Sequence, residues 1–93
     1  GGMLDSILQD RRECYITGST EGLHRHHVYA GGRRSASERW GCWVWLRWDW
    51  HTGDCGVHRN TEFDRRLKRE CQEKFEELYG HEKFMKVFGK NFL

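Results

Sequence analysis

The spacing of apolar side chains changes near Asn60, and this change constrains the fold more than any other feature of the chain. Residues 40–50 carry all five tryptophans in a run of bulky side chains that is typical of a β-strand. After Asn60 the apolar residues recur every three or four positions, which predicts a helix with one buried stripe. The stripe consists of Phe63, Leu67, Cys71, Phe75 and Leu78.

These two patterns predict an α+β fold built on a two-stranded antiparallel hairpin. We expect strands near residues 24–30 and 41–47, packed against a helix over about residues 61–79. Residues 33–39 between the strands are expected to form a polar loop, and a short helix should follow Gly80. Alternation along the second strand places Cys42, Val44, Leu46 and Trp48 on one face, and Trp43, Trp45 and Arg47 on the other.

The chain length of 93 residues suits one small domain. Gly1 and Gly2 precede Met3 and look like a cloning remnant, so we assign the single domain to residues 3–93. No apolar run approaches the about 20 residues that cross a bilayer, and no signal-peptide pattern is present. We therefore expect no membrane partner and a cytoplasmic location.

The net charge of +2 is too small for a strongly basic nucleic-acid binder, but the arginines are clustered. Arg33, Arg34 and Arg39 surround the first predicted loop, and Arg59 lies in the second. These four residues are candidates for a positive patch that contacts DNA. The alternative is an ordinary surface on which charges are interspersed.

Histidines are concentrated at the predicted strands and loops. His24, His26 and His27 lie within four residues, and His51 and His58 follow the tryptophan-rich segment. Neutral imidazole is the commonest protein metal ligand, and it also changes protonation near neutral pH. The cluster is therefore a candidate metal and acid–base site. The alternative is a polar, solvated loop.

The pattern of several of these residues resembles that of the HNH nuclease family, also called the ββα-metal or His-Me finger family. The resemblance rests on His26-His27-Val28, Gly31-Gly32, Trp43-Val44-Trp45-Leu46 and His51. It is strongest to small HNH-type proteins of bacteriophages and prophages, in which a Gly-Val-His-x-Asn stretch leads into a helix ending in Tyr-Gly-His-Glu. The corresponding stretches are Gly56-Val57-His58-Arg59-Asn60 and Tyr79-Gly80-His81-Glu82, so that the resemblance covers most of residues 13–93.

The family pattern implies a role for each histidine. His26 would ligate a divalent metal ion (Mg²⁺, Mn²⁺ or Zn²⁺), with His51 as a second ligand and His58 as a third ligand or a phosphate contact. His27 would be the general base that activates water. Because neighbours on a strand point to opposite sides, His26 and His27 cannot both ligate one ion, and we expect a backbone carbonyl to hold the His27 ring.

The implied function is that of a phage-encoded, metal-dependent DNA endonuclease or nickase on a ββα-metal fold. The chain departs from the family in its cysteines. Many relatives carry two Cys-x-x-Cys pairs that bind a structural zinc, whereas here the corresponding stretches are Cys14-x-x-Thr17 and Arg47-x-x-Trp50. We therefore expect no structural zinc at that place. Cys42 stands near the position of the family's central asparagine.

These departures favour an alternative in which a degenerate HNH fold binds nucleic acid or a host protein, for example as a phage-encoded inhibitor. A partner surface or a homodimer through exposed tryptophans such as Trp43 or Trp45 belongs to this alternative. A third possibility is a small structural domain in which the histidines are merely solvated.

Overall fold

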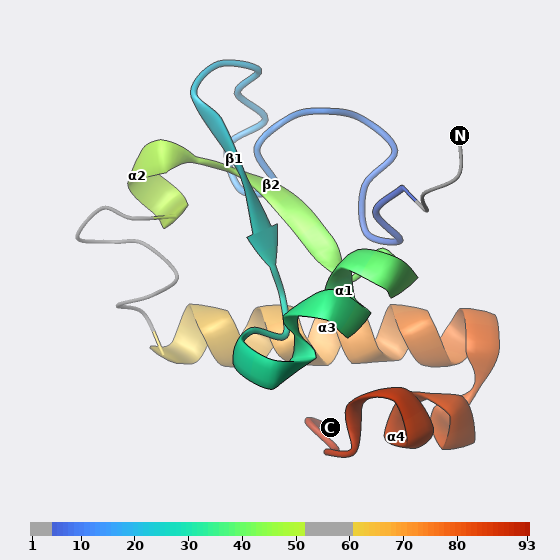
Figure 1. Ribbon diagram of the computed structural model, residues 1–93. Coiled ribbons are helices and arrows are strands. Elements are labelled where there is room, and N and C mark those ends of the chain that lie inside the picture. Colours follow the sequence, from blue (N-terminus) through green and yellow to red (C-terminus); the bar gives the residue numbers. More distant parts are fainter. Residues whose placement is uncertain (1–4, 52–60) are drawn as a thin grey trace.

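The computed structural model describes residues 5–51 and 61–93 (Figure 1). Within them the structure is α+β, with one two-stranded antiparallel sheet, a long helix and several short ones. In chain order the elements are β1 (Leu23–His27), η1 (Gly31–Arg33), α1 (Arg34–Trp40), β2 (Trp43–Arg47), α2 (Trp48–His51), α3 (Thr61–Tyr79) and α4 (His81–Phe88). None of the helices in these residues is long and apolar enough to cross a membrane.

The register of the hairpin decides which face each side chain occupies. His24 pairs with Leu46 and His26 with Val44, so these four residues share one face of the sheet. Val44 and Leu46 are fully buried in a core to which α3 contributes, so this face is the inner one. Arg25 and His27 pair with tryptophans of β2 on the outer face.

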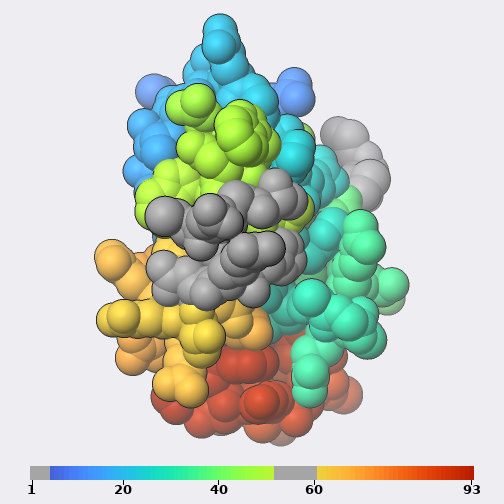
Figure 2. Space-filling model, turned by 90° about the vertical axis from the view of Figure 1, so that its left-hand side faces the viewer, coloured from blue at the N-terminus to red at the C-terminus, as the bar shows by residue number. Residues whose placement is uncertain are grey.

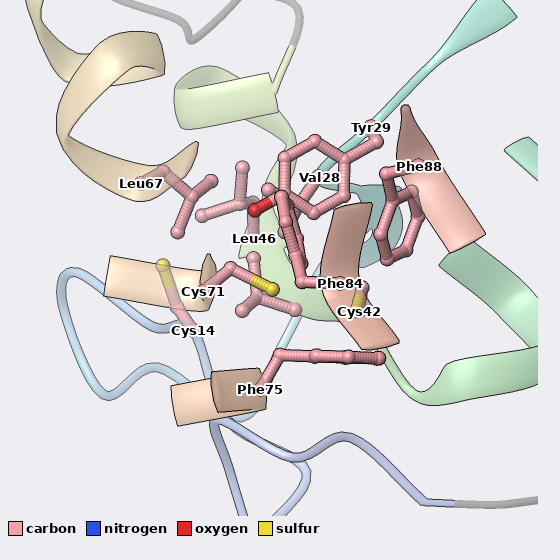
Figure 3. Close-up of a cluster of buried hydrophobic side chains, with 11 residues drawn as sticks. Cys14, Val28, Tyr29, Cys42, Leu46, Leu67, Cys71, Phe75, Phe84 and Phe88 are labelled. Atoms are coloured by element: carbon pink, nitrogen blue, oxygen red, sulfur yellow. The ribbon is translucent and has the colours of Figure 1, made fainter. Parts of the chain in front are cut away.

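The core lies between the inner face of the hairpin, α3 and α4 (Figures 1 and 3). The predicted helix over residues 61–79 is confirmed, and its stripe is buried at Leu67, Cys71 and Phe75. The inclusion of Leu78 in the stripe is wrong, because its side chain is 51% exposed. In the middle of α3 the polar residue Gln72 is also buried, where the C-terminal tail packs against the helix.

The prediction of a polar loop over residues 33–39 is wrong, because this stretch contains α1. The helix buries Ser37, whose hydroxyl donates a hydrogen bond to the Tyr29 carbonyl at 2.7 Å and accepts one from the Tyr29 N–H at 3.1 Å. Gly41 ends α1 in a left-handed conformation (φ +73°) that L side chains rarely adopt. The hydrogen-bonded hydroxyl of Ser37 therefore holds α1 in place, although the sequence of this helix has almost no apolar periodicity.

The tryptophan-rich run does not continue as one strand. Trp40 ends α1, β2 covers only residues 43–47, and Trp48 begins α2. The strand-based placement of Trp48 beside Leu46 is therefore wrong, and its side chain is 51% exposed. Trp43, expected as a candidate exposed residue, is only 6% exposed.

The N-terminal segment covers the outer edge of β2. The Trp45 N–H donates to the Gln9 side-chain oxygen, and the Trp45 carbonyl accepts from the Tyr15 N–H, both at 2.8 Å. Further along, the Ile7 N–H donates to the Gly41 carbonyl at 2.9 Å. These contacts satisfy backbone groups that a two-stranded sheet otherwise leaves open to pairing with another chain.

Candidate functional site

Strand β1 sends its adjacent histidines to opposite sides of the hairpin. His24 and His26 lie on the inner face, whereas His27 lies on the outer face together with Arg25. The expectation that His26 and His27 cannot both face one ion follows directly from this backbone geometry.

On the inner side, three histidines come together. His51, the last residue of α2, has its ring centre 5.3 Å from that of His24 and 5.3 Å from that of His26. The Nδ1 atoms of His24 and His51 are 3.2 Å apart. His24 is exposed, His51 is half-buried, and His26 is 5% exposed, so the three rings lead from solvent towards the core. Figure 2 shows the face on which α2 lies above the start of α3.

This spacing is compatible with metal ligation by a pair of imidazoles. Two nitrogens, each about 2.0–2.1 Å from a tetrahedral ion, lie roughly 3.3 Å apart. The Nδ1 atoms of His24 and His51 meet that distance at 3.2 Å. Within residues 5–51 and 61–93, no group of three histidine, cysteine or acidic side chains has the geometry of a complete metal site. The predicted ligand His58 lies outside the described residues.

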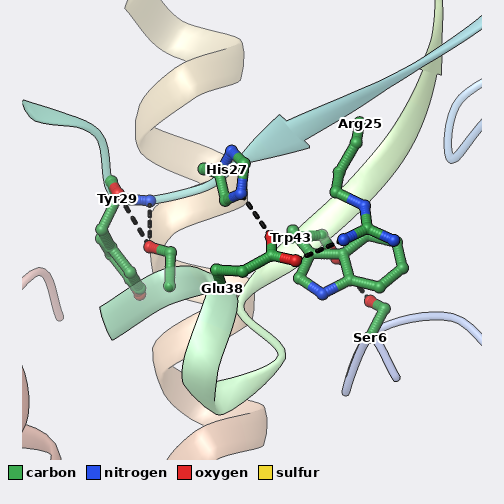
Figure 4. Close-up of polar contacts among 7 residues, drawn as sticks. Ser6, Arg25, His27, Tyr29, Glu38 and Trp43 are labelled. Carbon is green, nitrogen blue, oxygen red and sulfur yellow. Dashed lines mark hydrogen bonds and ion pairs between the residues drawn. The ribbon is translucent and has the colours of Figure 1, made fainter. Parts of the chain in front are cut away.

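On the outer side, Glu38 of α1 holds His27. Its Oε2 atom is 2.5 Å from His27 Nε2, and its Oε1 atom accepts a hydrogen bond from the Arg25 guanidinium (Figure 4). The expectation of a backbone carbonyl as the partner of His27 is wrong, because a carboxylate takes that place. A carboxylate held by an arginine fixes both the orientation and the tautomer of the ring.

His26 and His27 line one shared pocket of about 250 Å³. Thr61, Asp64 and Lys68, from the first two turns of α3, contribute to its opposite wall. The Lys68 ammonium pairs with the Asp64 carboxylate at 2.8 Å. A helix N-terminus and a lysine together favour an anionic group such as a phosphate.

The three arginine candidates among the described residues do not all face the same way. Arg33 donates from Nε to the Phe88 carbonyl at 2.9 Å and so ties η1 to the end of α4. Arg34 and Arg39 are both exposed, but they lie five residues apart along α1 and therefore point in different directions. Arg59 lies outside the described residues.

The thiol of Cys14 is held by hydrogen bonds. Cys14 is buried, and the backbone N–H of Thr17 donates to its sulfur at 3.5 Å. Burial raises the pKa of Cys14, but hydrogen bonds from Thr17 and from the backbone of Arg47 and Ile16 outweigh it and lower the pKa overall. Thr17 and the backbone of Arg47 thus both contact this thiol.

The family resemblance assigns no role to two residues of the candidate site, His24 and Glu38. His24 was part of the histidine cluster, and its spacing of two from His26 is the signal that would have placed both on one strand face. Glu38 gives no such signal, because it lies in a stretch without apolar periodicity and reaches His27 only from α1. The chain matches no protein-family model, and no curated protein or solved structure is significantly similar to it.

Proposed function

We propose that this protein is a metal-dependent DNA endonuclease or nickase of the HNH type, of the kind encoded by phages. The observation that carries the proposal is that two adjacent histidines face opposite sides of the hairpin and line one pocket. His26 faces His51 on the inner side of the hairpin, whereas His27 is held by a carboxylate on the outer side. An adjacent ligand and base are what a one-metal hydrolysis of a phosphodiester needs.

The metal would be held by His26 and His51, with His58 as the third ligand implied by the resemblance. When bound, a divalent ion supplies Lewis-acid stabilisation to the phosphate and to the leaving 3′ oxygen.

His27 would act as the general base. Because the Glu38 carboxylate only accepts hydrogen bonds, the neutral ring must carry its proton on Nε2, which leaves the Nδ1 lone pair to take a proton from water. The imidazolium that forms is then stabilised by the negative charge of Glu38. Lys68 and the first turn of α3 would orient the phosphate from the other wall of the pocket.

The experiment that tests this function is the nicking of supercoiled plasmid by the full chain. We expect relaxation and linearisation in the presence of a divalent ion, loss of both with EDTA, and recovery when the ion is restored. A His81→Ala variant is the control, because His81 is an exposed histidine that pairs with Glu76 away from the pocket. Failure of every divalent ion to support nicking would overturn the proposal.

A binding module remains the second candidate, and one observation bears on its surface. The Arg25 guanidinium lies 4.0 Å from the ring centre of Trp43, and that of Arg12 lies 4.8 Å from the ring centre of Trp45. The chain's own arginines thus cover the two tryptophans expected to bind a partner, which leaves Trp48 as the more exposed aromatic residue. Plasmid binding without nicking is the result that would favour this candidate.

A further inference from the structure

We propose that His24 is an additional ligand of the metal site, and that the site therefore selects imidazole-binding transition ions such as Zn²⁺, Co²⁺ or Ni²⁺ over Mg²⁺. The inference rests on the proposed metal site of His26 and His51. It adds a residue to which the family resemblance assigns no role, and it names the class of ion.

The distances carry the first step of the argument. In a tetrahedral site a ring centre lies roughly 3.2 Å from the ion, so two ligating rings have centres about 5.2 Å apart. The ring centre of His51 lies 5.3 Å from that of His24 and 5.3 Å from that of His26. The His51 ring thus has two imidazole neighbours at a separation that a shared ion allows. The described residues hold no complete group of three ligands as they stand, so the rings must turn to close the site.

The backbone enforces this arrangement. The Trp48 N–H donates to the Gly22 carbonyl at 2.9 Å, which fixes the start of α2 to the residue before β1. Gly22 has φ +62°, and a Cβ atom there would approach the Trp48 ring to 3.0 Å, so the close contact needs a glycine. Pinned at Gly22, α2 places His51 over the inner face of β1.

The chemistry of the donors decides the class of ion. The three side chains are all imidazoles, and imidazole nitrogen suits zinc, copper, nickel and iron, whereas magnesium prefers oxygen ligands. The exposed position of His24 keeps one side of the site open to solvent, as an ion that must also bind a substrate requires. The competing explanation for the 3.2 Å contact is a hydrogen bond between two neutral rings, which involves no ion.

The test is titration of the metal-free full chain with Co²⁺, followed by visible absorption, and with Zn²⁺, followed by calorimetry, both without DNA. We expect saturable binding of both ions that millimolar Mg²⁺ does not displace. His24→Gln should weaken the affinity at least about tenfold, whereas the control His81→Gln should leave it unchanged. Because His24 is exposed, His24→Gln should retain the circular dichroism spectrum and melting temperature of the wild type.

Two results would overturn the inference. One is an unchanged affinity in His24→Gln, and the other is Mg²⁺ binding as tightly as Co²⁺. A His51→Gln variant separates the two proposals. If His51→Gln abolishes binding while His24→Gln does not weaken it, the metal site of the proposed nuclease stands and the role of His24 is refuted. If the wild type binds no ion, the inference fails, and plasmid nicking with and without EDTA decides the function.

Discussion

At the scale of single residues, the Glu38 carboxylate is the group on which the proposed chemistry depends most. It contacts His27 through one oxygen and Arg25 through the other, so that it is both oriented and partly neutralised (Figure 4). Such a carboxylate–imidazole pair fixes which ring nitrogen carries the proton. Glu38 is therefore a positioning residue that acts through His27.

Replacing Glu38 should slow nicking without affecting the metal. We expect Glu38→Ala to lower the rate at least about tenfold and to leave Co²⁺ affinity unchanged, because the tautomer of His27 is no longer fixed. Glu38→Gln should restore part of the rate, since its amide oxygen can still accept the Nε2 proton. Nitrogen NMR of the wild-type His27 ring should show the Nε2-protonated tautomer.

The control for this prediction is Glu77→Gln, because Glu77 is an exposed acidic residue on α3. An Nδ1-protonated tautomer in the wild type, or a Glu38→Ala rate equal to that of the wild type, would contradict the role of Glu38.

A second prediction at this scale concerns Tyr15. Burial, together with the hydrogen bond to Glu70 and the negative charge of that residue, raises the pKa of Tyr15 to about 12. Since the folded state holds this proton more tightly than the unfolded chain, the stability due to Tyr15 is complete below about pH 10 and is lost as the pH rises towards 12. Urea unfolding should show a smaller decline over this range in Tyr15→Phe than in the wild type. Parallel declines would contradict the assignment.

At the scale of elements, α1 is the part of the fold that connects structure to function. It supplies Glu38 to the site, and Ser37 attaches it to the chain beyond β1 through both backbone groups of Tyr29. Ser37 and Tyr29 are both buried, so water does not compete for the hydrogen bonds between them. The position of the helix, and hence of Glu38, should depend on this one hydroxyl.

Removal of the Ser37 hydroxyl should destabilise the protein. Ser37→Ala leaves a buried N–H and a buried carbonyl of Tyr29 without that partner, which should lower the free energy of unfolding by about 1–3 kcal/mol. Ser35→Ala is the matched control, because Ser35 is exposed on the same helix and alanine is a better helix former. Equal stabilities of the two variants in urea unfolding would refute this account of α1.

At the scale of the whole molecule, the C-terminal tail closes the core through a buried glutamine. The Gln72 side-chain oxygen accepts from the Phe92 N–H at 2.7 Å, and its amide donates to Glu76 and to Asn91, each at 2.7 Å. Phe92 in turn lies against Tyr29, with ring centres 5.0 Å apart. One satisfied amide thus joins α3 to the tail and to the core below the hairpin.

Gln72→Ala should therefore lower the stability of the protein more than an ordinary substitution on a helix does. We expect a loss of about 2–3 kcal/mol in the free energy of unfolding, because the tail loses its anchor and Asn91 and the Phe92 N–H lose their partner. Glu73→Ala, at the exposed neighbouring position, should change the stability by less than about 0.5 kcal/mol. A loss in Gln72→Ala no larger than that in Glu73→Ala would contradict the proposed anchor.

How much the sequence could predict depended on whether apolar spacing carried the signal. The helix over residues 61–79 and the two antiparallel strands have clear periodicity, and their existence was predicted, although β1 ends at His27 rather than at residue 30. The helix α1 has no apolar stripe, because its buried residue is a serine satisfied by distant backbone groups. A pattern of polar residues cannot reveal such an anchor.

The candidate site could likewise be predicted only where a local pattern determines it. The alternation of a strand was enough to separate His26 from His27, and the same rule places His24 beside His26. The partner of His27 could not be predicted, because Glu38 reaches it only through the three-dimensional position of α1. The approach of His51 to His24 likewise depends on the contact between Gly22 and Trp48, which no local pattern encodes.

In the proposed mechanism His26 ligates the metal and His27 transfers the proton, and parallel assays of His27→Ala and His26→Ala separate these two roles. Plasmid nicking and Co²⁺ affinity should be measured together, between about pH 6 and 8, where imidazole ordinarily changes protonation. We predict that His27→Ala retains the affinity while nicking falls by about 10²–10⁴-fold, whereas His26→Ala loses affinity and activity together. Equal nicking by the wild type and His27→Ala across this range would contradict the role of His27.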